Sequence, residues 1–266
     1  MRFKDKDMKN KERKELAVCG WAAVKALAEQ HGYKIERLYF TKERAKELGA
    51  VCKALAARKK PYNMVEDESE LEKLSGTPHH QGAVAMIAQP VIPALNSDIV
   101  AKWIEEKESV AILDRVGNAN NLGAIARSAA FFGVKNIVIP LDEAQTSITT
   151  SSYRVAQGGM ERVAFFSVKS IEALLKDLKG RMFRIGTALE AKTPVSEIKN
   201  LRGKLPVAIV LGNEEHGISD AVKRNCDELV IIPFAGMDKG EDSPVESLNV
   251  AQAASIIFYE QAQKAL

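Results

Sequence analysis

A chain of 266 residues is long enough for two domains, and a hydrophobic content of 46% is typical of globular proteins that bury a core. The formal net charge of +3 is too small to identify a nucleic acid or any other highly charged partner. No apolar stretch approaches the ~20 residues that cross a bilayer, and no apolar signal region follows the N-terminus. We therefore expect a cytoplasmic protein without a membrane anchor.

The basic residues are distributed unevenly. The first fourteen residues carry seven lysines or arginines against three acids, and Arg58, Lys59 and Lys60 form a second cluster. Such clusters are compatible with RNA binding but also typical of solvated surfaces. The three cysteines are scattered, without the paired spacing of a zinc site. We expect no metal and a reducing compartment.

The first part of the chain predicts a small α/β domain. Apolar periodicity and capping residues predict helices over 21–30, 41–58 and 68–74, and strands over 35–40, 63–65 and 82–88. Pro90, Pro93 and a polar stretch at 96–98 then interrupt the pattern. These boundaries predict a domain at 1–92 with a basic tail at 1–14, followed by a linker and leading helix at 93–106.

Residues 107–266 predict a larger α/β domain, because short apolar runs alternate with helical segments. Strands are predicted over 110–116, 136–141, 163–168, 183–188, 207–212 and 229–233. Helices are predicted over 122–132, 171–178, 219–226 and from 248 onward. The run 207–211 is apolar at every position, which is typical of a parallel strand buried on both faces. We expect ligands beyond the carboxyl ends of these strands.

The first polar segment after a predicted strand covers residues 114–127. Asn121 and Gly123 open a helix, and Arg127 follows about one and a half turns later. Such a loop can present amide groups to an anion or a ribose. It can equally be an ordinary helix cap followed by an arginine that faces solvent.

Two further polar segments follow later strands. In the second, Gly212 and Gly217 bracket two glutamates and His216, and glycine permits close backbone approach to a ligand. The glutamates can also be an acidic first helical turn. In the third, Ser247 and Asn249 open a final helix rich in small residues, where capping residues are expected in any case.

Taken together, NNLGAIAR at 120–127, LGNEEHGIS at 211–219 and IIPF…SLNVAQAASI at 231–256 resemble the three ordered motifs of the SpoU–TrmH family of RNA methyltransferases, in the SPOUT superfamily. The sequence His80-Gln-Gly82 before an apolar strand is similar to the L30e-like RNA-binding domain often attached to this family. The resemblance implies an L30e-like α/β domain followed by a SPOUT α/β knot, with a deep trefoil knot and a mostly parallel sheet.

The resemblance also implies a function. It implies transfer of a methyl group from S-adenosylmethionine to a ribose 2′-hydroxyl of rRNA or tRNA, and the attached N-terminal domain favours rRNA. The enzyme would be a homodimer in which Arg127 of one subunit faces the methyl donor bound by the other. The family's functional positions correspond to Asn121, Arg127, Glu214, Ser247 and Asn249. The positions that would hold the donor are Thr187, Leu211, Gly212, Asn213, Gly217, Ile232, Pro233, Ser247 and Leu248.

The role of Arg127 stays open at the level of sequence. A ribose 2′-hydroxyl is a poor nucleophile until its proton is removed or strongly hydrogen-bonded, and Arg127 is proposed in this family as the activating base. A guanidinium group rarely loses a proton, so Arg127 can instead grip the adjacent phosphate in a bidentate manner. Asn121 would position Arg127 or the ribose, Glu214 would hold the loop or Arg127, and Ser247 and Asn249 would shape the pockets.

The sequence departs from the family pattern in one place, and two other functions are considered. The stretch MDKGEDSPVE at 237–246 is longer than in compact family members, and it is either a lid or an inert insertion. A nicotinamide-dependent oxidoreductase requires GxGxxG after the first strand, which residues 117–123 lack. A catalytically inactive RNA-binding protein would keep the knotted fold, but all five matched polar positions are present here.

Overall fold

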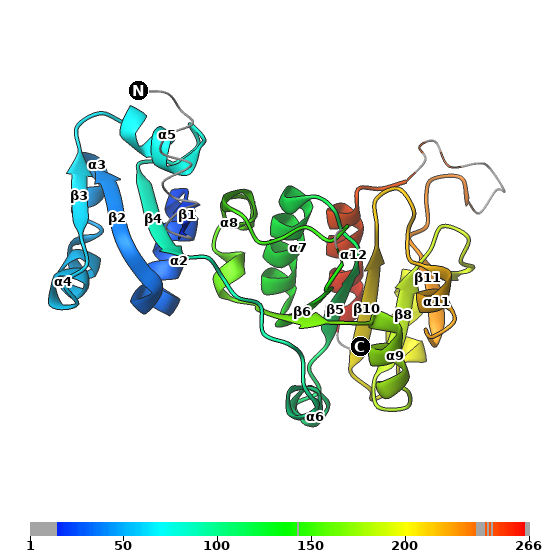
Figure 1. Ribbon diagram of the computed structural model, residues 1–266. Helices are drawn as coiled ribbons and strands as arrows, with labels where there is room; N and C mark the ends of the chain where they lie inside the picture. Colours follow the sequence, from blue (N-terminus) through cyan, green and yellow to red (C-terminus); the bar gives the residue numbers. More distant parts are fainter. Residues whose placement is uncertain (1–14, 143, 238–242, 244, 246, 264–266) are drawn as a thin grey trace. The chain divides into compact units, whose positions relative to one another are not determined.

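The computed structural model describes residues 15–142, 144–237, 243, 245 and 247–263. The chain divides into two compact units (Figure 1). Unit 1 comprises Met1–Val91 and Ile148–Arg162, and unit 2 comprises Ile92–Ser147 and Val163–Leu266, so the chain passes between the units three times. The predicted basic tail and most of the predicted 237–246 loop lie outside the described residues.

Unit 1 contains a four-stranded sheet with the order β1-β4-β2-β3, in which β4 runs antiparallel to β1 and β2, and β3 runs parallel to β2. Its elements are β1 (Glu15–Cys19), α2 (Trp21–His31), η1 (Gly32–Lys34), β2 (Ile35–Thr41), α3 (Lys42–Ala45), α4 (Gly49–Ala57), β3 (Tyr62–Val65), α5 (Ser69–Ser75), β4 (Ala83–Ala88), α8 (Thr150–Ala156) and η2 (Gly159–Glu161). The sequence analysis missed β1.

The single helix predicted over 41–58 is wrong, because two short helices, α3 and α4, occupy this range. Leu48 lies between them and is fully buried, so the chain turns inward at the point where Gly49 begins α4. The basic cluster that follows has a structural role. Arg58 donates to the carbonyl oxygen of Gly32 at 2.9 Å and also to that of Tyr33. Lys60 forms an ion pair with Glu36.

The segment Ile148–Arg162 belongs to unit 1, although it lies between two strands of the unit 2 sheet in sequence. Gly158 has a φ of 93°, and a Cβ atom there would come within 2.8 Å of the Ala26 Cβ atom on α2. The buried carboxyl group of Glu161 lies 3.5 Å from Nε2 of His31, at the end of the same helix. These contacts require glycine at 158 and fix the segment against α2.

Unit 2 contains a seven-stranded, entirely parallel sheet with the order β7-β6-β5-β10-β8-β11-β9. Its elements are α6 (Ser97–Glu105), β5 (Val110–Asp114), α7 (Ala119–Phe132), β6 (Asn136–Pro140), β7 (Ala164–Val168), α9 (Ile171–Asp177), β8 (Phe183–Thr187), β9 (Thr193–Pro194), η3 (Val195–Glu197), α10 (Ile198–Leu201), β10 (Val207–Gly212), α11 (Asp220–Lys223), β11 (Glu228–Ile231) and α12 (Val250–Ala262). The predicted α/β class and mostly parallel sheet are confirmed.

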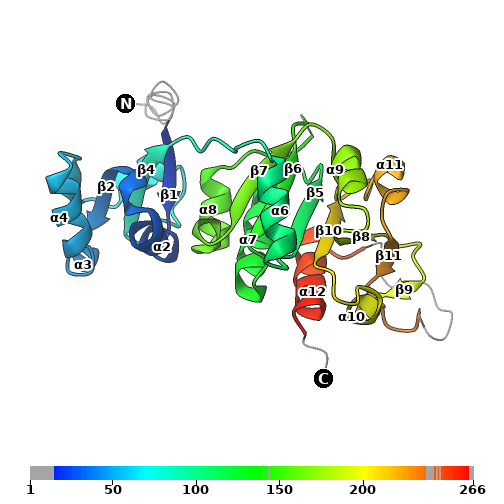
Figure 2. The ribbon, with the colours of Figure 1, turned by 90° about the horizontal axis from the view of Figure 1, so that it is seen from below.

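Helices cover both faces of this sheet. Apolar side chains of α6, α9 and α11 form one core with β5, β6 and β10, while α7 and α12 pack together on the other face (Figure 2). Strand β10 is buried at all six positions between β5 and β8, so the parallel strand predicted at 207–212 is confirmed. Small residues permit the close contact of α7 with α12, where the Ser128 and Ser255 hydroxyl oxygens are 2.7 Å apart.

The linker after unit 1 protects an edge of the sheet. Ala94 pairs in parallel with Ser167 on β7, and Ser167 N–H donates to the Pro93 carbonyl oxygen at 2.8 Å. Unpaired edge strands promote association with other chains, so this short bridge limits that risk. Asn96 then caps α6, because its side chain accepts the Ile99 N–H at 3.0 Å.

A buried ion pair connects β8 with the residue before β11. Arg184 is 4% exposed, and its guanidinium donates to both carboxylate oxygens of Asp227 and to the Leu175 carbonyl oxygen. Partial burial by itself raises the pKa of Asp227, but the hydrogen bonds from Arg184 outweigh it, and the pKa lies below its ordinary value. Arg184 would be left buried without a counter-ion if Asp227 were removed.

We expect Asp227→Ala to destabilise the fold by about 3–5 kcal/mol in urea unfolding followed by circular dichroism. The control Asp177→Ala removes an exposed partner of Arg181 and should cost less than about 0.5 kcal/mol. Because the folded pKa of Asp227 is lowered, its contribution is present above about pH 4 and is lost as the pH falls through the folded value. Equal destabilisation by both variants would contradict this assignment.

Candidate active site

The site begins where two central strands end side by side. Gly212, the last residue of β10, lies opposite Asp114, the last residue of β5. Because these strands are parallel and buried on both faces, the loops that follow them leave the sheet at the same edge. Helix α7 begins at this edge, and the side chain of Asn118 caps it by accepting the Asn120 N–H.

The loop after β10 is a tight turn that only glycine permits. Asn213 and Gly217 exchange backbone hydrogen bonds of 3.1 and 3.0 Å. A Cβ atom on Gly212 would lie 2.2 Å from the Gly217 carbonyl carbon, so no side chain fits there. Gly217 itself adopts a φ of 63°, which favours glycine. The conformation of this loop therefore requires both glycines of the second motif, Gly212 and Gly217.

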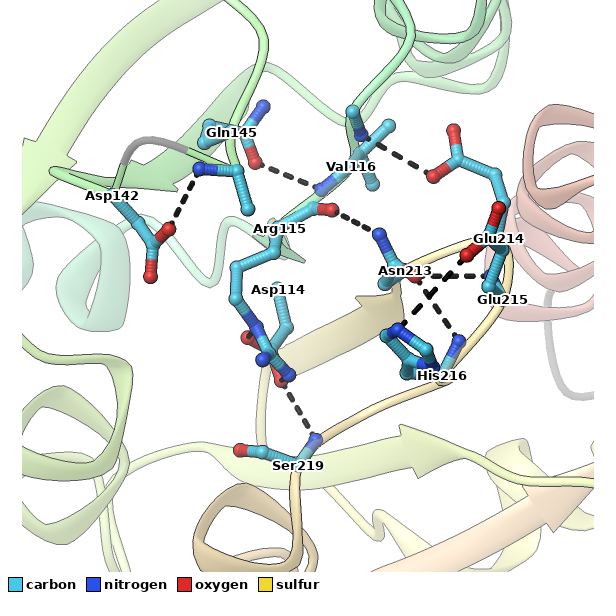
Figure 3. A network of polar contacts seen from close by, with 12 residues as sticks. Asp114, Arg115, Val116, Asp142, Gln145, Asn213, Glu214, Glu215, His216 and Ser219 are labelled. Carbon is cyan, nitrogen blue, oxygen red and sulfur yellow. Dashed lines mark hydrogen bonds and ion pairs between the residues drawn. The ribbon is translucent and has the colours of Figure 1, made fainter.

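Asn213 organises this loop from within (Figure 3). Its amide nitrogen donates to the Arg115 carbonyl oxygen at 2.8 Å, and its amide oxygen accepts the N–H groups of Glu215 and His216. The side chain thus connects the second motif to the loop after β5. Asn213 was predicted to hold a cofactor, and the structure gives it these loop contacts.

Asp114 and Arg115 form a second connection that the sequence analysis missed. Asp114 is 4% exposed, accepts the Ser219 N–H at 2.8 Å and also accepts Nε–H of Arg115 at 3.0 Å (Figure 3). Arg115 has a φ of 61°, a conformation that costs a non-glycine residue about 1 kcal/mol or more. A carboxylate at the end of an otherwise apolar strand was the available signal for Asp114.

A chain of side-chain hydrogen bonds joins all three sequence motifs. Glu214 accepts the Gly117 N–H at 3.2 Å and the amide N–H of Asn121 at 2.7 Å. The amide oxygen of Asn121 accepts from the Asn249 amide at 3.0 Å, and Asn249 caps α12 by accepting the Ala251 N–H at 2.9 Å. The structure therefore brings Asn121, Glu214 and Asn249 together.

Arg127 and Ser247 do not join this chain of hydrogen bonds. Arg127 is exposed on α7, and its guanidinium makes no hydrogen bond or ion pair within the part of the chain that the structure describes. It follows Asn121 by six positions, so the two side chains point about 120° apart around the helix. Ser247 is exposed before α12. Glu214 therefore binds the loop after β5, through Gly117 and Asn121, and does not bind Arg127.

Seven of the nine positions predicted to hold a cofactor lie at or just after the carboxyl ends of β8, β10 and β11, and the other two, Ser247 and Leu248, lie just before α12. Thr187 ends β8 and donates to the Val210 carbonyl oxygen at 3.3 Å. Leu211 is buried with its side chain in the core, so only its backbone can meet a ligand. Ile232 is half-buried, Pro233 is exposed and Leu248 is 44% exposed. Apolar and backbone groups thus predominate at these strand ends.

In the part of the chain that is described, no group of three His, Cys, Asp or Glu side chains is placed to hold a metal ion. The His216 side chain is exposed, and its Nε2 atom lies 4.0 Å from a carboxylate oxygen of Glu215. Among the described helices, none has the length and apolar character needed to cross a membrane.

Comparison with known proteins decides the family. A model of the SpoU rRNA Methylase family matches residues 108–259, which is more than half of the chain. This chain belongs to that family. A second model, described as RNA 2′-O ribose methyltransferase substrate binding, matches residues 17–93. The resemblance to SpoU–TrmH proteins inferred from the three motifs is therefore confirmed.

Curated relatives cover the SpoU chain almost from end to end. A protein of Nitrosomonas europaea named 23S rRNA (guanosine-2′-O-)-methyltransferase RlmB is 30% identical over 91% of this chain and 89% of its own length. The proteins of the same name from Coxiella burnetii and Ralstonia nicotianae are 33% and 32% identical, and the matches cover 94% and 95% of those relatives.

Solved structures support the SpoU fold. The SpoU methyltransferase AviRb of Streptomyces viridochromogenes, in complex with AdoMet, superposes with a TM-score of 0.73 at 23% identity, covering 98% of this chain and 97% of that one. An AdoMet-bound rRNA methyltransferase from Sinorhizobium meliloti gives a TM-score of 0.72 at 20% identity, over 97% and 93% of the two chains. At these identities the likeness establishes the fold alone.

We expect Glu214→Ala to loosen the loop after β5, because Gly117 N–H and Asn121 lose their common acceptor. Hydrogen–deuterium exchange of a peptide covering 115–123 should become faster, while the free energy of unfolding changes by less than about 0.5 kcal/mol because Glu214 is exposed. Glu215→Ala is the matched control, since Glu215 has no side-chain link to that loop. Unchanged exchange in Glu214→Ala would contradict the bridging role.

Proposed function

We propose that this chain is an S-adenosylmethionine-dependent RNA methyltransferase that modifies a ribose 2′-hydroxyl. The observation that carries the proposal is the hydrogen-bonded chain Glu214–Asn121–Asn249, which unites the three SpoU motifs at the carboxyl ends of the parallel strands. A protein that kept the fold only for RNA binding would not need this arrangement. The alternative of an inactive RNA-binding protein is therefore not favoured.

The substrate class follows from the relatives. Three curated relatives, matched over 91–93% of this chain and 89–95% of their own length, are named for a guanosine of 23S rRNA. We assign the same class of substrate, the ribose of a guanosine in 23S rRNA, to this protein. This narrows the choice between rRNA and tRNA that the sequence left open, and it implies a cytoplasmic enzyme.

The strand ends of β8, β10 and β11 fit the methyl donor. The proposed donor site comprises Thr187, Leu211, Gly212, Asn213, Gly217, Ile232, Pro233, Ser247 and Leu248. Half-buried Ile232 and exposed Leu248 offer apolar contacts to an adenine ring, and backbone groups at the strand ends offer donors and acceptors. The family's trefoil knot is part of this proposal, and the central place of β10 between β5 and β8 is compatible with it.

S-adenosylmethionine, when bound, supplies a methyl group on a sulfonium, and the ribose oxygen must lie in line with the S–CH3 bond. Asn121 and Asn249 are held by hydrogen bonds on both sides, so they fix the geometry of the acceptor edge. The exposed guanidinium of Arg127 binds a phosphate next to the target ribose in a bidentate manner. This role orients the ribose without requiring the guanidinium to lose a proton.

The active enzyme is a homodimer in this proposal. Phe131 is 79% exposed and Tyr259 is 49% exposed, and the ring of Phe132 contacts both, with centroids 5.0 and 6.0 Å away. An exposed aromatic cluster on α7 and α12 is typical of a protein interface. Arg127 lies one turn before Phe131 on the same face of α7. A partner that covers Phe131 would therefore also lie next to Arg127.

The domains have separate tasks. Residues 1–92 recognise the RNA, residues 93–106 connect the domains, and residues 107–266 perform methyl transfer. The match of a substrate-binding model to residues 17–93 supports the first assignment.

We expect Arg127→Ala to lower methyl transfer to 23S rRNA by at least 100-fold while calorimetric binding of S-adenosylmethionine stays within about twofold, because Arg127 contacts RNA and not the donor. Arg181→Ala, which removes an exposed arginine elsewhere in unit 2, serves as the control. Activity of Arg127→Ala near that of the wild type would contradict the acceptor assignment. No donor binding by folded wild-type protein would contradict the methyltransferase proposal.

We expect Phe131→Asp to convert the dimer to a monomer, because the charge would be buried without a partner in the interface. Analytical ultracentrifugation measures the change, and Leu141→Asp provides a control at an exposed leucine that is not on α7 or α12. Methyl transfer should fall with dimer content. A Phe131→Asp protein that remains dimeric would rule out this interface.

A further inference from the structure

Three loops meet at one edge of the unit 1 sheet. Trp21 follows β1, Arg44 follows β2, and Gln81 precedes β4. Because β4 runs antiparallel to β1 and β2, the ends of those strands and the start of β4 lie at the same edge. The Cζ atom of Arg44 lies 4.6 Å from the centroid of the Trp21 ring, so the guanidinium covers part of the indole face.

Gln81 fixes both members of this stack. Its side-chain oxygen accepts the Trp21 backbone N–H at 2.9 Å, and its carbonyl oxygen accepts Nε–H of Arg44 at 3.2 Å. Gln81 does so with a φ of 51°, a left-handed conformation that disfavours residues other than glycine and asparagine. Strained backbone of this kind is retained where surrounding contacts hold it, and it is concentrated at ligand sites.

Gly82 makes room for Arg44. Its φ is 79°, and a Cβ atom at this position would lie 2.8 Å from Oγ1 of Thr41 and 3.2 Å from Cγ of Arg44. Any side chain would push the aliphatic part of Arg44 away from the sheet edge. The glycine is therefore part of what places the guanidinium over the ring.

The charge of Arg44 is already balanced. Nη1 of Arg44 donates to Glu47 at 2.9 Å, and the Arg44 side chain remains 28% exposed. Nη2 of Arg44 and the indole N–H of Trp21 have no hydrogen-bond partner among the residues the structure describes. The part-exposed side chains of Trp21 and Arg44 thus offer two free donors, while Glu47 offsets part of the attraction of Arg44 for phosphate.

We propose that the Trp21–Arg44 stack, held by Gln81, is a platform on which an unpaired nucleobase of the RNA substrate stacks. This inference rests on the proposed function, because it takes RNA as the substrate. Bases within a duplex are covered on both faces by their neighbours, whereas an unpaired base exposes a planar face to an aromatic ring or a guanidinium plane. The two free donors can bind acceptors on the edge of that base.

Fluorescence of the intact protein tests the platform directly. The only other tryptophan, Trp103, is 2% exposed in the unit 2 core, so quenching by a ligand reports on Trp21. A single-stranded oligoadenylate of roughly eight nucleotides should quench the emission, and the same strand in a duplex with oligouridylate should not. The quenching should be absent in Trp21→Phe. Unquenched wild-type emission with the single strand overturns the proposal.

Affinity measurements separate stacking from charge. Trp21→Ala should weaken binding of the oligoadenylate by about tenfold to 100-fold, and Arg44→Lys should weaken it as well because lysine has no planar group. The salt dependence of binding should keep its slope in Trp21→Ala, since no phosphate contact is lost. Tyr33→Ala is the matched control, because Tyr33 is 66% exposed next to the opposite end of β2.

The two proposals fail in different ways. If wild-type protein binds the oligonucleotide, and Trp21→Ala and Tyr33→Ala bind it equally well, the platform is overturned while methyl transfer is untouched. If Arg44→Lys keeps the full affinity of the wild type, the planar group is not needed, Arg44 acts by charge alone, and the platform is again overturned. If the wild type binds the oligonucleotide through Trp21 but methylates no ribose in 23S rRNA, the methyltransferase proposal fails and the platform stands.

Discussion

Burial of the central strands on both faces constrains everything else in unit 2. Strand β10 has no exposed position, and its neighbour β5 is buried to its last residue, so polar chemistry is confined to the strand ends. The register that places Gly212 opposite Asp114 brings the loops after β5 and β10 together. Only then can one carboxylate, that of Glu214, bind both the Gly117 N–H and the Asn121 amide.

Glycine permits close contacts at the ends of strands in both units. In the loop after β10, Gly212 leaves space for the backbone of Gly217, and before β4, Gly82 leaves space for Arg44. A non-glycine residue with positive φ lies close to each glycine: Arg115 in the neighbouring loop after β5, and Gln81 directly before Gly82. In both places hydrogen bonds from neighbouring segments stabilise a conformation that local sequence disfavours.

The sequence predicted what local periodicity determines and missed what distant contacts determine. The apolar runs identified most strands, and motif order identified the family, because those signals are contained within short windows. The split of 41–58 depends on where Leu48 meets the core, and the buried Asp114 matters only because Ser219 approaches it from over a hundred residues away. Arg58, likewise, belongs to the turn around Gly32 and not to a basic surface.

The membership of Ile148–Arg162 in unit 1 has a consequence for biosynthesis. The strands of unit 1 are complete by residue 88, yet the surface of α2 that receives Gly158 and Glu161 stays uncovered until residue 162 has been made. At ~5–20 residues per second, these roughly 70 residues correspond to about 4–15 s of translation. During this interval the surface of α2 around Ala26 stays uncovered on the nascent chain, and unit 1 reaches its final state while five of the seven strands of the unit 2 sheet remain to be synthesised.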